Sequence, residues 1–132
     1  MLHHKNLVTK DDISYMNELV SEIRPADKNE LRLIVDYYSA NCPTDSLNWV
    51  DISDITDLSE LFQGTNYQYC LYNGDISKWD VSNVKNMIRM FKSSFFNGDI
   101  SEWDVSNVIY MSHMFEDSEF TRDISKWDVS NV

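Results

Sequence analysis

The sequence predicts an α/β solenoid with one short strand and one short helix in each 24-residue coil, preceded by a two-helix N-terminal cap. The first observation behind this prediction is a repeat: DIS[KE]WDVSNV begins at Asp75, Asp99 and Asp123, and only its fourth position varies. The second is the helical spacing of apolar residues, both within the repeats and before them. Because one such unit cannot bury its apolar face alone, adjacent coils must complete its core.

Each repeat carries one pattern typical of a helix and one typical of a strand. Val84, Met87 and Phe91 are spaced i, i+3 and i+7, which predicts a short helix. The apolar stretches at residues 96–100 and 120–124 predict short strands. In stacked coils these strands would pair in parallel, about 4.8 Å apart.

The repeats divide the chain into two predicted domains. A degenerate copy that starts at Asp51 lies 29 residues before its counterpart at Asp80, which equals one 24-residue repeat plus a five-residue insertion. The domains are therefore a helical cap at residues 1–45 and solenoid repeats at residues 46–132. The repeats are the degenerate 46–74, then 75–98, 99–122 and a partial 123–132.

The first 45 residues show the signals of two amphipathic helices. Thr9 with Asp12 resembles a capping box, and apolar residues at helical spacing follow as far as Ile23. Asp27 with Glu30 begins a second helix. Its apolar stripe is Leu31, Ile34, Val35 and Tyr38. We interpret the pair as a cap on the first coil of the solenoid.

Composition and charge exclude several classes of protein. The 132 residues carry 22 acidic and 11 basic side chains, a formal net charge of −11, so we expect no direct nucleic acid binding. No apolar run approaches the roughly 18 residues of a membrane span, and residues 1–10 lack the apolar stretch of a secretory signal. We expect a cytoplasmic protein without membrane insertion, or a cell-surface protein if a leader was removed.

The residue types that catalyse reactions or hold metals have no recognisable spacing. His3, His4 and His113 form no ligand set, and Cys42 and Cys70 lie outside any CxxC or Cys/His cluster. We therefore predict ordinary thiols, no cofactor, no metal and no enzymatic activity.

Aspartates and tryptophans recur at fixed positions, so each set would stack as a ladder. The recurring residues are Asp75, Asp99 and Asp123, then Asp80, Asp104 and Asp128, and Trp79, Trp103 and Trp127. For the aspartates we favour turn hydrogen bonds within each coil over a bound Ca²⁺, because no EF-hand spacing is present. The tryptophans suit either a packed core or an exposed binding stripe, and we favour partial burial.

One combination of residues in the repeat is specific to a known family. It consists of Trp79, Asp80, Ser82, Asn83, Val84, Met87, Met90 and Phe91. The repeat resembles those of BspA-like leucine-rich-repeat bacterial surface proteins, tightly over residues 75–132 and loosely over 49–74. The resemblance implies a leucine-rich-repeat-like solenoid that binds proteins, often at a cell surface, without catalysis.

The first functional hypothesis is a protein-recognition module whose partner contacts the varied positions of the repeats. These positions keep the same frame while their chemistry changes from coil to coil, at little structural cost. The predicted contact residues are Lys85, Arg89 and Lys92 in one coil and Ile109, His113, Glu116 and Glu119 in the next.

The second hypothesis is a small acidic inhibitor or decoy that blocks a cationic, nucleic-acid-binding groove on another protein. Its predicted contact residues are Asp51, Asp54, Asp57 and Glu60. A cell-surface adhesion fragment and a purely structural assembly unit are the remaining alternatives. The third decapeptide reaches Val132 without a Met-x-x-Met-Phe segment, so we expect another chain to cover this open coil, either a second copy or the partner. For self-association we favour a closed homodimer over head-to-tail filaments.

Overall fold

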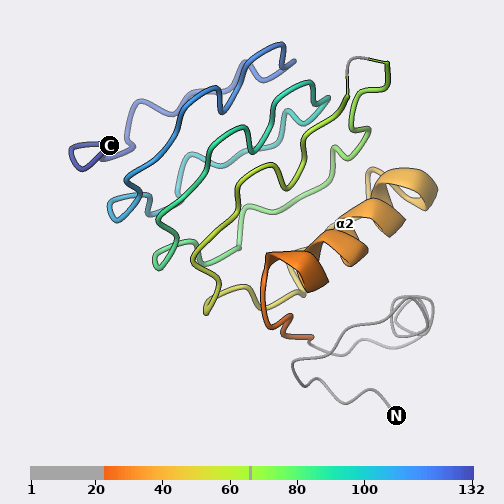
Figure 1. Ribbon diagram of the computed structural model, residues 1–132, viewed down its shortest axis with the longest axis horizontal. Coiled ribbons are helices and arrows are strands. Elements are labelled where there is room, and N and C mark those ends of the chain that lie inside the picture. The colour runs from red at the N-terminus through yellow and green to blue at the C-terminus, as the bar shows by residue number, and fades with distance from the viewer. Residues whose placement is uncertain (1–22, 66) are drawn as a thin grey trace.

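The computed structural model describes residues 23–65 and 67–132. This part of the chain contains one helix, α2 (Lys28–Asn41), followed by irregular coils joined by isolated β-bridges rather than strands (Figure 1). The predicted first helix falls outside the described residues except for Ile23, which forms a parallel bridge with Val50. The described part therefore shows one helix, and the prediction of a two-helix cap is wrong there.

Helix α2 begins and ends where its sequence predicts. The Asp27 carboxylate accepts from the Glu30 N–H at 3.0 Å, and the Glu30 carboxylate accepts from the N–H of Ala26, the residue before the N-cap, at 2.7 Å, an arrangement close to a capping box. The helix ends before Cys42, and Pro43 follows. Its buried residues are Leu31, Ile34, Val35 and Tyr38, so the predicted stripe is confirmed.

The repeats form coils that lie side by side, from the coil next to α2 to the C-terminal one (Figure 1). Parallel bridges join equivalent positions of successive coils: Asn86 pairs with both Asp57 and Tyr110, and Cys70 pairs with Ser94. The steps from 86 to 110 and from 70 to 94 are 24 residues, and the step from 57 to 86 is 29. The repeat in the sequence is thus a repeat in space.

The prediction of one strand and one helix in each coil is wrong. Residues 84–91 contain one bridge residue, Asn86, and a turn at 88–91 but no helix, and residues 96–100 and 120–124 form no strand. The Met87 N–H donates to Tyr110 O of the next coil at 2.8 Å instead of to a carbonyl four residues earlier. Arg89 also has a φ of 54°, which an α-helix does not accommodate.

The apolar positions of the repeat nevertheless form the core, as predicted. Met87, Met90 and Phe91 are fully buried. The phenylalanine rings stack nearly parallel from coil to coil, at 5.3 Å between Phe62 and Phe91 and 5.6 Å between Phe91 and Phe115. Stacking between coils therefore supplies the burial that a single coil lacks.

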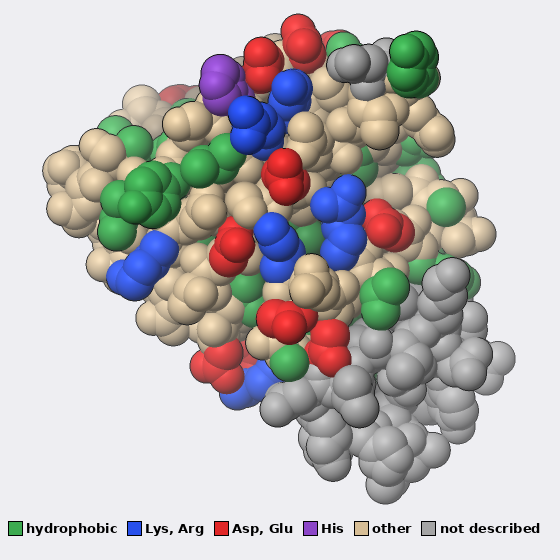
Figure 2. Space-filling model, viewed as in Figure 1, with side chains coloured by type: hydrophobic (Ala, Val, Ile, Leu, Met, Phe, Trp, Pro, Cys, Tyr) green, Lys and Arg blue, Asp and Glu red, His purple; other side chains and the backbone are tan. Residues whose placement is uncertain are grey.

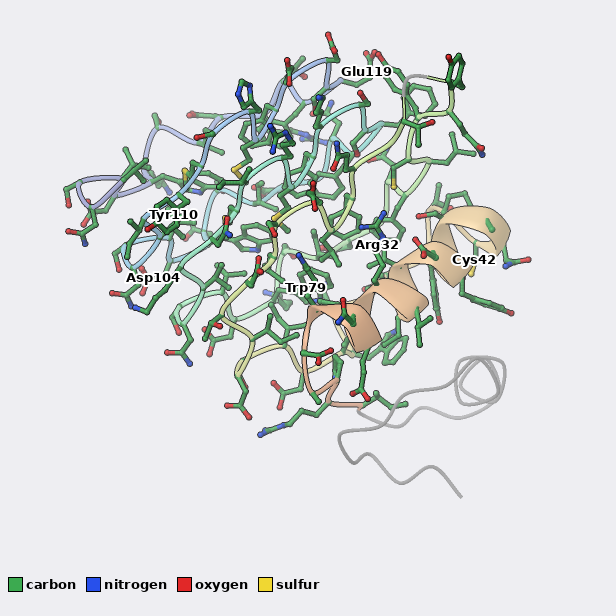
Figure 3. The ribbon with its side chains drawn as sticks, in the orientation of Figure 1. Arg32, Cys42, Trp79, Asp104, Tyr110 and Glu119 are labelled. Atoms are coloured by element: carbon green, nitrogen blue, oxygen red, sulfur yellow. The ribbon has the colours of Figure 1, made fainter. Side chains whose placement is uncertain are left out.

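The tryptophans also stack from coil to coil as a ladder, and Trp79 and Trp103 are more deeply buried than the partial burial that we expected. Trp79, labelled in Figure 3, and Trp103 are each 4% exposed, and Trp127 is half-buried. Their rings lie 6.5 and 6.4 Å apart in successive coils. Each indole N–H donates to a main-chain carbonyl of the preceding coil, as Trp103 Nε1 does to Ile76 O at 3.1 Å. The ladder is part of the core and not a binding stripe.

The polar residues of the decapeptide make the turns and join the coils. The Asp104 carboxylate accepts from the Ser106 N–H at 3.0 Å and from the Ser106 hydroxyl at 2.6 Å. The Asn107 side chain donates to Ser82 O of the preceding coil at 2.7 Å. The same contacts recur in the coils before and after. The interpretation of the aspartates as turn residues is confirmed.

Helix α2 lies along the first coil, where a preceding coil would otherwise pack (Figure 1). Its buried stripe joins the same apolar core as the coils. Lys28 Nζ donates to the Ser59 hydroxyl at 2.8 Å, and the Arg32 guanidinium donates to Glu60 O at 2.7 Å. The helix therefore covers the start of the stack with both apolar and polar contacts.

Candidate functional site

Three equivalent segments, residues 58–64, 87–93 and 111–117, lie next to one another on one side of the stack, and we call their surface the turn face (Figure 1). Alternate main-chain N–H groups donate to the next segment: Phe62 N to Met90 O at 2.8 Å is one such bond. Other N–H groups close turns within a coil. Hydrogen bonds thus hold the backbone of the turn face both within and between coils.

Non-glycine residues with positive φ line up across the turn face. Glu60, Arg89 and His113 form one row, with φ of 62°, 54° and 57°. Ser93 and Asp117 form a second row, both at 53°. The left-handed conformation costs about 1–2 kcal/mol for a residue with a Cβ. The inter-coil hydrogen bonds therefore impose one strained backbone on side chains of different charge.

Four residues of the predicted recognition surface lie on the turn face. Lys92 Nζ lies 3.3 Å from Glu116 Oε2, and His113 Nδ1 lies 3.5 Å from the same oxygen. Arg89 has no ion-pair partner among the described residues. In Figure 2, Lys and Arg side chains gather near the middle of this side, with acidic side chains around them.

The other predicted recognition residues lie at the two ends of the turn face. Lys85 and Ile109 precede their segments, and the Ile109 N–H donates to Lys85 O at 2.8 Å. Glu119, labelled in Figure 3, follows the last segment, and its N–H donates to Ser94 O at 3.1 Å. The structure therefore spreads the predicted set along one side of the stack instead of gathering it at one point.

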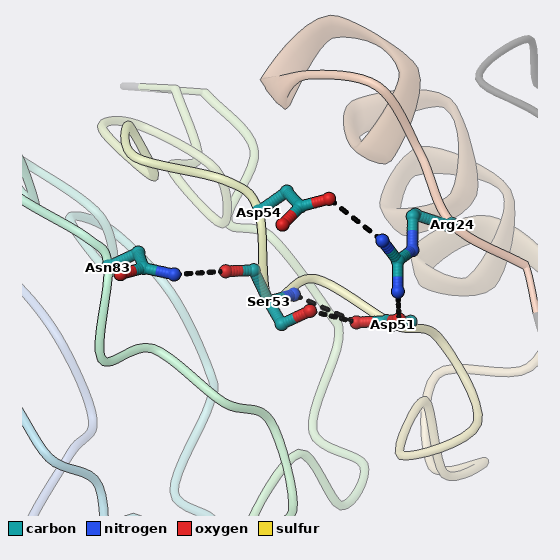
Figure 4. Close-up of polar contacts among 5 residues, drawn as sticks. All are labelled: Arg24, Asp51, Ser53, Asp54 and Asn83. Carbon is teal, nitrogen blue, oxygen red and sulfur yellow. Dashed lines mark hydrogen bonds and ion pairs between the residues drawn. The ribbon is translucent and has the colours of Figure 1, made fainter.

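The first two residues of the predicted acidic set share one arginine (Figure 4). Arg24 lies 2.6 Å from Asp51 and 2.8 Å from Asp54. The Ser53 hydroxyl, its N–H and the Arg24 guanidinium together hold the pKa of Asp51 below its ordinary value, although burial acts against them. Asn83 of the next coil donates to Ser53 O at 2.8 Å, which ties this turn to the stack.

The other two acidic residues, Asp57 and Glu60, face bases of α2. Lys28 Nζ lies 3.6 Å from the Asp57 carboxylate. Arg32, labelled in Figure 3, donates to the main-chain oxygen of Glu60 and pairs with Asp36 of its own helix at 3.2 Å. The Glu60 carboxylate has no ion-pair partner among residues 23–65 and 67–132.

The sequence analysis missed the three bases that meet the first coil. Arg24, Lys28 and Arg32 were not assigned a role, yet each contacts that coil. For Lys28 and Arg32 the spacing of four residues was an available signal, since it places both side chains on one face of the helix, whereas Arg24 precedes the helix. The partners, however, lie about 30 residues away in the chain, and no local pattern joins them.

The remaining features of the described residues concern metal ligands, thiols and a surface hollow. No group of three His, Cys, Asp or Glu side chains in residues 23–65 and 67–132 is placed to hold a metal ion. Cys42 and Cys70 are free thiols, and burial raises the pKa of Cys42. A hollow of about 420 Å³ is lined by α2 and the loop after the first turn segment, and the Ser39 hydroxyl contacts the Cys70 thiol there at 3.5 Å. None of the helices in the described part is long and apolar enough to cross a membrane.

Comparison with known proteins places the chain in a family. No curated protein and no solved structure gave a match to it. The sequence model of one family matches residues 34–132, which include most of α2 and all of the coils. The chain therefore belongs to the family described as Mycoplasma protein of unknown function, DUF285.

Proposed function

We propose that this chain is a non-enzymatic protein-binding module and that its partner contacts the turn face. One observation carries the proposal: Glu60, Arg89 and His113 occupy equivalent positions of a hydrogen-bonded backbone but differ in charge. Strained backbone that the surrounding structure enforces is typical of functional surfaces. A frame that is already ordered also lowers the entropy lost when a partner binds.

The charges of the turn face favour a protein partner over a polyanion. Arg89 and Lys92 lie in the middle segment, while Glu60 and Glu116 lie in the segments on either side. A nucleic acid needs clustered cations, whereas a mixed surface is complementary to another mixed surface. The face thus offers alternating charge within a protein whose net charge is −11.

Arg89 is the residue from which we expect the largest single contribution to binding. It is partly exposed and lies between Glu60 and His113 in its row of positive-φ residues. It has no ion-pair partner in the described part of the chain. Arginine is enriched among residues that dominate binding energies, because its planar guanidinium donates several hydrogen bonds in a fixed geometry.

The resemblance of the repeats to BspA-like leucine-rich-repeat surface proteins supports the same class of function. Membership of the DUF285 family is consistent with a repeat protein, and it names no activity. A cell-surface adhesion fragment would be one form of this binding function and would use the same face.

The acidic decoy receives less support from the structure. Asp51 and Asp54 are paired with Arg24, and Asp57 lies close to Lys28. A decoy for a cationic groove needs carboxylates that are free to meet the groove, and here three of the four predicted ones already have a basic neighbour.

Affinity capture with matched charge reversals tests the proposal. Arg89→Glu changes the turn face, and Lys78→Glu makes the same change of charge at an exposed position outside the turn segments. We expect a protein that is captured by the wild type and by Lys78→Glu to be lost with Arg89→Glu. Its affinity, measured by calorimetry, should fall by roughly tenfold or more for Arg89→Glu, as for a central interface residue.

Salt separates this function from the decoy. Binding through the turn face should weaken modestly as ionic strength rises, whereas binding through the net charge should collapse. Equal strengthening with both charge reversals, each of which adds negative charge, or a cationic partner released by moderate salt, would support the decoy instead. Capture that neither variant changes would refute a role of the turn face.

A further inference from the structure

A second hollow, of about 470 Å³, opens where α2 and the first two turn segments meet. We call it the basic hollow, and the residues that line it are Arg32, Gln63, Gly64, Thr65, Lys92 and Ser93. Two of these six residues are cations and none is acidic, although the whole chain carries a net charge of −11. The lining of the basic hollow is therefore opposite in charge to the protein as a whole.

The Ser93 hydroxyl is the group of the basic hollow that points to a ligand. Ser93 is 5% exposed, and its hydroxyl has no hydrogen-bond partner among residues 23–65 and 67–132. Every side-chain polar atom that is fully enclosed in that part of the chain has a partner, so the Ser93 oxygen is reached through the hollow that it lines. Because nearly buried hydroxyls are normally hydrogen-bonded, this one is suited to a bond with a bound group.

Other side chains bring unused donors to the same space. The Gln63 amide has no hydrogen-bond partner in the described part of the chain. Arg32 donates to its neighbours through Nε and Nη1, which leaves the two hydrogens of Nη2. The Lys92 ammonium has three hydrogens and one ion-pair neighbour, Glu116 at 3.3 Å. Donors from α2 and from two coils thus surround one hollow, which is the arrangement that an anion needs.

The charges around the basic hollow favour a single carboxylate over a phosphate group. Arg32 and Lys92 supply two positive charges, while Asp36 lies 3.2 Å from the first and Glu116 lies 3.3 Å from the second. These pairs are partly exposed and weak, yet they offset part of the charge that a ligand would meet. A carboxylate carries one negative charge, whereas a phosphate monoester carries about 1.5–2 at neutral pH. The charge that remains suits the carboxylate.

We propose that the basic hollow binds the carboxylate side chain of an Asp or Glu residue of the protein partner. The proposal rests on the proposed function, since Lys92 and Ser93 belong to the same segment of the turn face as Arg89. Arg32 Nη2 and Lys92 Nζ donate charge-assisted hydrogen bonds to the carboxylate, and the Ser93 hydroxyl donates a third. The volume lies within the roughly 300–1,000 Å³ of small-molecule sites, so the backbone that carries the acidic residue fits as well.

Titration of the ¹⁵N-labelled full chain with N-acetylglutamate N-methylamide tests the proposal. This capped glutamate presents one carboxylate on a polypeptide backbone, and capped glutamine of the same shape is the neutral control. With ionic strength held constant by sodium chloride, we expect capped glutamate to give saturable shifts of the Gly64, Thr65 and Ser93 amide signals at millimolar concentrations. Capped glutamine should give none, and inorganic phosphate should bind more weakly than capped glutamate.

Matched variants show whether the hollow itself is the site. Lys92→Gln and Ser93→Ala should each weaken the binding of capped glutamate by roughly tenfold, as expected for a lost hydrogen bond to a charged group. Lys78→Gln removes the same charge at an exposed position outside the turn segments, and it should change the affinity by less than about twofold. Lys92 is partly exposed, so Lys92→Gln retains the test if Ser93→Ala folds poorly.

Four outcomes would overturn the proposal. They are no saturable shift with capped glutamate, equal binding of capped glutamine, equal loss with Lys78→Gln and Lys92→Gln, and tighter binding of phosphate. The last outcome would make a phosphorylated segment the occupant. None of these measurements uses the partner, and Arg89 does not line the hollow, so failure here is distinguishable from failure of the proposed function.

Discussion

Replacing Trp103 by alanine, with Trp127→Ala as the comparison, measures how much stability the buried indole ladder provides. Trp103 is 4% exposed, and its ring lies 6.5 Å from Trp79 and 6.4 Å from Trp127. Trp127 is the last tryptophan of the ladder, half-buried, with a tryptophan neighbour on one side. The two substitutions remove the same atoms from an interior and a terminal position.

The structure sets the expected magnitudes. Truncating a buried tryptophan costs about 3–5 kcal/mol of unfolding free energy, from lost burial and the remaining cavity. Loss of the hydrogen bond from Trp103 Nε1 to Ile76 O adds about 0.5–1.5 kcal/mol. That carbonyl still accepts from the Trp79 N–H, so it is not left unpaired. We expect about 4–6 kcal/mol for Trp103→Ala, and about half of that for Trp127→Ala.

Urea unfolding followed by circular dichroism measures the difference. With a slope of about 2 kcal/mol per molar urea, a difference of about 2 kcal/mol separates the two midpoints by about 1 M. Trp103→Phe keeps a ring but removes the indole N–H, so its midpoint should lie between those of the wild type and Trp103→Ala. Equal midpoints for the two alanine variants would refute the reasoning that burial between two coils stabilises the ladder.

Three further predictions concern other contacts of the stack. Asn107→Ala removes a 2.7 Å hydrogen bond to the preceding coil and should lower the unfolding free energy by about 1 kcal/mol, again measured in urea. Gly74→Ala should lower the melting temperature more than Gly98→Ala in calorimetry, because its Cβ would lie 2.1 Å from a main-chain oxygen, whereas the nearest atom at Gly98 is a Phe96 ring carbon at 2.7 Å. The unfolding free energy measured against pH should fall below about pH 3.8. The pKa of Asp51 is lowered in the folded state, chiefly by the Ser53 hydroxyl. The contribution of Asp51 to stability is therefore present above the unfolded pKa of 3.8 and is lost as the pH falls through the lower folded pKa. An Asp51→Asn variant with an unchanged pH profile would contradict this assignment.

The sequence by itself determined the features that depend on local chemistry and on period. The 24-residue repeat predicted the step between coils, and the apolar spacing predicted the buried residues, among them Met87 and Phe91. The capping box at Asp27 and Glu30 predicted the start of α2. Asp and Ser two residues apart predicted the turns, because a short carboxylate side chain bonds the main chain nearby. Among the candidate site residues, repetition also predicted that Arg89 and His113 occupy equivalent positions.

Only the tertiary structure decided the secondary structure of the repeats. Residues 84–91 have the spacing of a helix, but the N–H groups of Met87, Arg89 and Phe91 donate to carbonyls of the next coil instead of to their own. Positive φ at Arg89 follows from that arrangement and has no signature in the local sequence.

The ion pairs of the first coil and the hydrogen bonds between coils could not be predicted from the sequence. Arg24 reaches Asp51 and Asp54 across about 30 residues, and that contact removes free charge from the predicted acidic surface. Alternate N–H groups of residues 58–64 and 87–93 donate to the next coil, and no pattern in the sequence marks which groups do so. A periodic pattern records what every coil shares, whereas the direction of inter-coil hydrogen bonds arises only when coils are placed against one another.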